Sequence, residues 1–199
     1  PHADLMESAL TWDLLAGIDL HGPEVLPVDK EIPDYWRRAK AAGKVTKAHA
    51  GEFLGWEFVQ WAVDHLDVDR IQHGVRAIES PALVEALARQ GTVLDVCPIS
   101  NVKLAVDGVD SMGEHPIRAL FDAGVNVTVN TDDTFMFGNT LAEEYYALHQ
   151  ALGFTPDEMK RIEVITIVRA FPLSRTLPDN EIDMNEAIAF IKSTEAVEL

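Results

Sequence analysis

The feature that most constrains the fold is a regular alternation of short apolar runs with longer segments of helical periodicity. The runs are 6–7 residues long and rich in aliphatic and β-branched side chains, which is typical of strands buried on both faces. They occupy residues 14–20, 44–49, 68–73, 92–97 and 125–131. Strands that alternate with helices through short links predict βαβ units and a parallel sheet, an α/β fold.

The segments between the runs, and the C-terminal part of the chain, carry helix signals. Ser80 is the predicted N-cap of a helix that has Pro81 in its first turn and ends before Gly91. Another helix is expected to open at His115-Pro116 and to end at Gly124. Further helices are predicted over residues 34–42, 57–65, 141–152, 156–170 and 184–191. No linker interrupts the pattern, so residues 1–199 are expected to belong to one domain.

Composition excludes several classes of function. With 33 acidic and 16 basic residues the chain carries a net charge of −17, which argues against binding to nucleic acid. Cys97 is the single cysteine, so an internal disulfide or a cysteine cluster for zinc is excluded. No apolar run reaches the roughly 18 residues of a membrane span, and the first residues have no signal-peptide character. We therefore expect a cytoplasmic protein without membrane contact.

Polar residues follow each predicted strand where a buried strand would choose apolar ones. His49 ends the second run, His73 the third, and Asp132 and Asp133 follow the fifth. In parallel α/β folds ligands bind at the carboxyl ends of the strands. This rim of the sheet is therefore the predicted active site.

The residue types at the rim favour a hydrolytic metal site. A lone histidine is more often a packing residue, but Glu52 lies three positions after His49, across Ala50-Gly51, and favours a zinc ligand. Asp132 and Asp133 would point to opposite sides along a strand, although such a pair is more often a turn or a helix cap. Zinc would lower the pKa of a water toward roughly 7, and a glutamate could move its proton. An amidase, a lactonase and a phosphotriesterase all remain open.

Four motifs taken together resemble the adenosine/adenine deaminase family of metal-dependent hydrolases. They are His49-Ala50-Gly51-Glu52, Arg70-Ile71-Gln72-His73-Gly74, Cys97-Pro98-Ile99-Ser100-Asn101 and Asn130-Thr131-Asp132-Asp133, in that order. The segment Asp19-Leu20-His21-Gly22-Pro23-Glu24 is similar to the family's preceding strand end. The resemblance runs from about residue 10 to residue 170 and implies deamination of a 6-aminopurine, adenosine or adenine, with release of ammonia.

The resemblance also implies roles for individual residues. His49 and Asp132 would be ligands of Zn²⁺, and Glu52 would donate a proton to the purine ring. A dry pocket that raises the pKa of Glu52 is therefore expected. His73 would position and deprotonate the attacking water, aided by Asp132. Asp133 would form a hydrogen bond with the purine, and the backbone of Gly22 would contact its far edge.

The chain departs from the family in one important respect. The family supplies two further zinc ligands from a His-x-His motif on its first strand, and no two of the seven histidines here are separated by one residue. The five runs match the fourth to eighth strands of the family's (β/α)₈ barrel, so a partial barrel with C-terminal helices is implied. The sequence is then a piece of a longer product, a chain completed by another chain, or a short derivative without activity.

Further expectations concern association, the environment of Lys47 and the substrate. An open sheet exposes unpaired edges, so self-association is possible, and a non-catalytic assembly or interaction module is the alternative to an enzyme. Lys47 shares a strand face with His49, and an inward lysine is costly unless it is paired or wet. Between the two substrates, Cys97–Leu104 and His115-Pro116 resemble the adenine branch, whereas Asn139–Tyr145 resembles the adenosine branch. The motifs favour adenosine narrowly.

Overall fold

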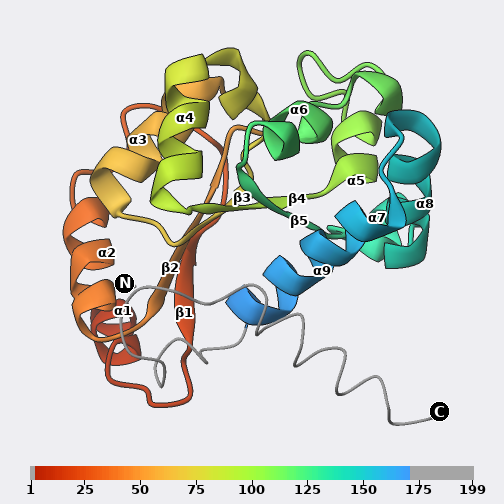
Figure 1. Cartoon of the computed structure of the whole chain (residues 1–199). Helices are drawn as coiled ribbons and strands as arrows, with labels where there is room; N and C mark the ends of the chain where they lie inside the picture. The colour runs from red at the N-terminus through yellow and green to blue at the C-terminus, as the bar shows by residue number, and fades with distance from the viewer. Residues whose placement is uncertain (1–2, 171–199) are drawn as a thin grey trace, which may run out of the picture.

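The computed structural model describes residues 3–170, which form one parallel sheet of five strands with helices around it (Figure 1). The strands are β1 (Gly17–Leu20), β2 (Val45–Ala50), β3 (Arg70–His73), β4 (Val93–Val96) and β5 (Asn126–Val129). Their order in the sheet is their order in the chain. Each strand lies in one of the predicted apolar runs, and only β2 extends a residue beyond it. The predicted parallel α/β architecture is confirmed.

The two faces of the sheet differ in chemistry because successive side chains alternate between them. Ala48, Ile71, Leu94 and Val127 stand side by side in register, and all four are fully buried in the hydrophobic core. The neighbouring positions carry polar side chains instead, for example Lys47 on β2. The sheet therefore packs one face on helices and presents a polar second face.

The helices that cover the sheet correspond to predicted ones. α2 (Ile32–Ala41), α3 (Trp56–Leu66), α4 (Pro81–Gln90) and α6 (Ile117–Asp122) lie along one side of the sheet in Figure 1. The Ser80 hydroxyl accepts a hydrogen bond from the Leu83 backbone N–H at 3.4 Å, so the predicted N-cap of α4 is confirmed.

Two longer helices follow the sheet, α8 (Leu141–Leu152) and α9 (Pro156–Ala170), and α9 packs against β5. Both were predicted with these bounds. The helix predicted over residues 184–191 lies outside the described residues.

Several short elements were not predicted. α5 (Pro98–Lys103) follows β4, α7 (Thr134–Phe137) follows the four residues after β5, and the 3₁₀ helices Val75–Glu79 and Met112–Glu114 lie in connections. α1 (Ala3–Ala9) precedes β1. One or two turns are too short to show a helical periodicity, which explains why the sequence pattern does not reveal α5 and α7. Between residues 3 and 170, no helix is long and apolar enough to cross a bilayer.

Candidate active site at the carboxyl edge of the sheet

Glu52 and His73 meet at the carboxyl-terminal edge of the sheet. Glu52 follows β2, His73 ends β3, and 3.4 Å separates Glu52 Oε2 from His73 Nε2. Both residues are buried. Burial, followed by the negative charges of Asp132 and Glu24, raises the pKa of Glu52 to about 7, against the opposing effect of His49. Burial also lowers the pKa of His73 to about 4. Burial thus raises the pKa of Glu52, and the fold places a protonatable carboxyl beside a neutral imidazole.

The loop that carries Glu52 is held by a carboxylate that sequence reasoning did not identify. Glu24, beyond β1, accepts hydrogen bonds from the backbone N–H groups of Glu52 and Phe53 at 3.0 Å each, and from that of Leu54. Gly51 before it has a φ of +74°, and a Cβ there would lie 2.3 Å from Val59 Cγ2. This turn therefore requires glycine and fixes the position of Glu52.

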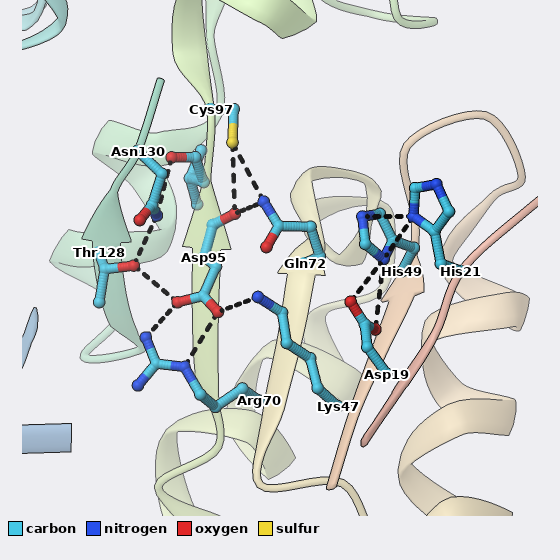
Figure 2. A network of polar contacts seen from close by, with 11 residues as sticks. Asp19, His21, Lys47, His49, Arg70, Gln72, Asp95, Cys97, Thr128 and Asn130 are labelled. Atoms are coloured by element: carbon cyan, nitrogen blue, oxygen red, sulfur yellow. Dashed lines mark hydrogen bonds and ion pairs between the residues drawn. The ribbon is translucent and has the colours of Figure 1, made fainter. Parts of the chain in front are cut away.

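His49 lies between two residues from the end of β1. Its Nδ1 is 3.1 Å and 3.3 Å from the two carboxylate oxygens of Asp19, and its Nε2 is 3.1 Å from Nδ1 of His21 (Figure 2). A carboxylate only accepts, so Nδ1 of His49 carries a proton. A carboxylate behind a histidine is the arrangement that orients a metal-ligating imidazole.

Asp132 and Asp133 have different hydrogen-bond partners. Both residues lie beyond the end of β5, so strand alternation does not separate them. Asp132 has a φ of +58°, and its carboxylate accepts a hydrogen bond from the Ser100 hydroxyl at 2.6 Å. Asp133 is the N-cap of α7 and accepts from the backbone N–H groups of Phe135 and Met136 at 2.9 Å and 3.0 Å.

A buried chain of hydrogen bonds runs away from His73. Its Nδ1 is 3.3 Å from Nδ2 of Asn101, and Oδ1 of Asn101 is 3.2 Å from Nε2 of His115. Nδ1 of His115 accepts from the backbone N–H of Ile117 at 3.1 Å. The three side chains that form this series of hydrogen bonds are at most 2% exposed; they belong to His73, Asn101 and His115. The sequence analysis placed His115 at a helix start and in a segment that resembles the adenine branch, but gave it no role in the site.

Below the rim, a second buried cluster surrounds Asp95 of β4 (Figure 2). Asp95 accepts hydrogen bonds from the Arg70 guanidinium and, at 2.8 Å, from the Thr128 hydroxyl. Lys47 Nζ lies 3.0 Å from Asp95 Oδ2. Burial opposes ionisation of Asp95, but Arg70, Lys47 and Thr128 prevail and lower its pKa. Lys47 is therefore paired with Asp95, which offsets the cost of a lysine that points into the sheet's polar face.

A metal ion has two candidate sets of ligands that share Asp132. The resemblance points to His49 and Asp132. By geometry, one ligand atom each of His73, Cys97 and Asp132 lies within 4.8 Å of the others. In that second set burial raises the pKa of the Cys97 thiol, and Gln72 Nε2 lies 3.1 Å from its sulfur. A thiol that keeps its proton is a poor ligand. Gly22, the remaining predicted residue, follows β1 with a φ of +137°.

A parallel sheet that gathers histidines and carboxylates at its carboxyl edge has the arrangement of (β/α)₈ barrels, which bind their ligands at that edge. The crystal structure of the adenine deaminase of Arthrobacter aurescens superposes on this chain with a TM-score of 0.73 at 31% identity. The match covers 94% of this chain and 58% of that enzyme. A zinc-bound amidohydrolase of Burkholderia ambifaria superposes with a TM-score of 0.72 at 26% identity, over 97% of this chain and 56% of that one.

The chain belongs to the adenosine deaminase family, whose model matches residues 8–176. A curated relative, the adenine deaminase of Streptomyces coelicolor, is 38% identical over 159 residues, which are 80% of this chain and 46% of that enzyme. The chain thus spans about half the length of the curated relatives it matches. The predicted family and the predicted partial barrel are confirmed.

Proposed function

We propose that this chain carries the acid–base half of a metal-dependent site for hydrolytic deamination of a 6-aminopurine, with loss of ammonia. The observation that carries the proposal is Glu52, a buried carboxyl whose pKa is raised to about 7 beside His73. A general acid that works near neutral pH needs this property.

Zinc fits the donor atoms of His49 and Asp132. The Asp19 carboxylate holds the proton of His49 on Nδ1, so Nε2 offers the neutral nitrogen that zinc prefers, and Asp132 offers a carboxylate oxygen. When bound, Zn²⁺ supplies Lewis-acid chemistry and lowers the pKa of a water toward about 7. Catalytic zinc sites usually have three protein ligands, so this pair needs further ligands from elsewhere.

The remaining roles belong to residues of the chain itself. Glu52 donates its proton to a ring nitrogen of the purine, which makes the neighbouring carbon electrophilic. His73, on the other side of the Glu52 carboxyl, contacts the oxygen that attacks this carbon. Asp133 and the backbone of Gly22 bind the edges of the purine. Glu24 supports these roles indirectly, because it fixes the loop of Glu52.

The motifs of the chain and the names of its curated relatives favour different purines. The motifs of the chain favour adenosine narrowly, whereas the curated relatives carry the name adenine deaminase. The ribose distinguishes the two substrates, and the partial barrel has no described contact that would select for or against it. We propose a 6-aminopurine base or nucleoside as the small-molecule partner.

The test is a deamination assay with adenine, adenosine and AMP, each with added Zn²⁺. Because the chain has two of the expected zinc ligands, the assay uses two proteins: the 199-residue chain and a chimera that joins it to the N-terminal half of the Arthrobacter enzyme. Ammonia release by the chimera, lost in its Glu52→Gln variant, supports the proposal. A folded, zinc-loaded chimera that deaminates none of the three purines would contradict it.

A further inference from the structure

In the series of hydrogen bonds behind His73, one backbone N–H group decides which atom donates and which accepts at each step. The N–H of Ile117 can only donate, and it faces Nδ1 of His115 at 3.1 Å. Nδ1 of His115 therefore carries no proton. His115 is 2% exposed, and burial alone lowers its pKa to about 3, so its ring is neutral and its proton lies on Nε2.

The amide of Asn101 transmits this direction. Nε2–H of His115 must donate to an acceptor, and at 3.2 Å that acceptor is the Asn101 oxygen. The Asn101 nitrogen then faces His73 and donates to its Nδ1 at 3.3 Å. The flipped amide would put a donor against Nε2–H of His115, so only one orientation satisfies both neighbours.

We propose that Asn101 and His115 are positioning residues that hold His73 in the tautomer with its proton on Nε2, so that His73 enters the site as a hydrogen-bond donor. Nε2 of His73 is the atom that faces Glu52, at 3.4 Å. With its Nδ1 already accepting from Asn101, the imidazole has no free lone pair. His73 therefore offers no vacant nitrogen to a metal ion.

The consequence for chemistry rests on the function proposed above. A nitrogen that carries a proton cannot accept the proton of water, so this role differs from the base that the family resemblance implies. As a donor, His73 stabilises negative charge on the oxygen that attacks the purine. The tautomer itself is a property of the folded chain and is measurable without turnover.

The experiment is long-range ¹H–¹⁵N correlation of the histidine rings in the metal-free 199-residue chain, at about pH 8 so that exposed imidazoles are neutral. Protonated and unprotonated ring nitrogens differ in ¹⁵N shift, so each tautomer has its own pattern. His65 and His149 supply the opposite reference, because their Nδ1 atoms face the carbonyl oxygens of Trp61 and Phe154. We expect the Nε2–H pattern for His73 and His115 and the Nδ1–H pattern for the two references.

The variant Asn101→Asp tests causation. An aspartate accepts from both neighbours, so His73 should move its proton to Nδ1 while His115 keeps the Nε2–H pattern. Asn126→Asp, at the start of β5, adds the same charge outside this hydrogen-bond chain and should leave His73 unchanged.

Two results would overturn the proposal: an Nδ1–H pattern for His73 in the unaltered chain, or an unchanged His73 in folded Asn101→Asp. The spectrum of the unaltered chain decides the matter if Asn101→Asp does not fold. Failure of the deamination assay with the expected spectrum would refute the proposed function and leave the tautomer standing.

Discussion

At the scale of the residue, Glu52 has the sharpest prediction. In the chimera described above, Glu52→Gln should keep its zinc and lose turnover by roughly 10²–10⁴-fold, because an amide is isosteric but has no acidic proton to donate. Steady-state kinetics together with metal analysis of the purified variant measure both quantities. Glu57→Gln, an exposed change of the same kind on α3, is the control and should retain turnover. Normal turnover in folded Glu52→Gln would remove Glu52 from the mechanism.

The adjacent aspartates give a second prediction at this scale. Asp132→Ala, like His49→Ala, should weaken zinc binding, because each variant removes one of the two proposed zinc ligands. Asp133→Ala should keep zinc and weaken purine binding, at a cost of about 1 kcal/mol in stability from the lost cap of α7. Titration of zinc against a chelating dye compares the variants directly. Loss of zinc in Asp133→Ala alone would mean that the two roles are reversed.

At the scale of the element, the start of α6 should make the fold sensitive to acid. In the unfolded chain His115 is protonated below about pH 6.5. In the folded chain burial lowers the pKa of His115 to about 3, so the imidazole stays neutral down to that pH. Stability from this group is therefore complete above pH 6.5 and is lost as the pH falls. Between pH 7 and pH 5 the loss is about 2 kcal/mol.

Urea unfolding of the unaltered chain and of His115→Gln at the two pH values measures this loss. The variant lacks the titrating group, so its stability should fall less between pH 7 and pH 5, by about 2 kcal/mol, whatever its absolute stability. His65→Gln, on the exposed side of α3, should behave as the unaltered chain does. An equal fall in all three proteins would show that His115 is not the acid-sensitive group.

The elements also show which features of the site could be read from the sequence. β-branched runs predict strands, and parallel strands must bring their carboxyl ends together, so the meeting of Glu52 and His73 is predictable. Glu24 and His115 are not, because their partners lie 28 and 14 positions away and no local pattern marks the contact. Asp133 shows the limit of periodicity, since a short helix replaces the strand that the alternation argument assumed.

At the scale of the whole molecule, the described sheet leaves β1 and β5 each paired on one side only. We expect the 199-residue chain alone to bind zinc weakly, to show no detectable deamination and to self-associate. The chimera should regain metal and activity together, because closure of the site and metal binding are coupled. Light scattering and the purine assay on both proteins measure this. Robust activity from a monomeric short chain would show that the zinc ligands are wrongly identified.

The order of the strands also bears on how such a chain is made. Because strands that are neighbours in the described sheet are also consecutive in the chain, each new strand–helix unit finds its neighbour already synthesised. Sheet formation can then follow the ribosome one unit at a time, with no long loop to close and little waiting for distant partners. In such an assembly the growing edge, and not the finished core, is the surface that is exposed longest and that chaperones have to protect.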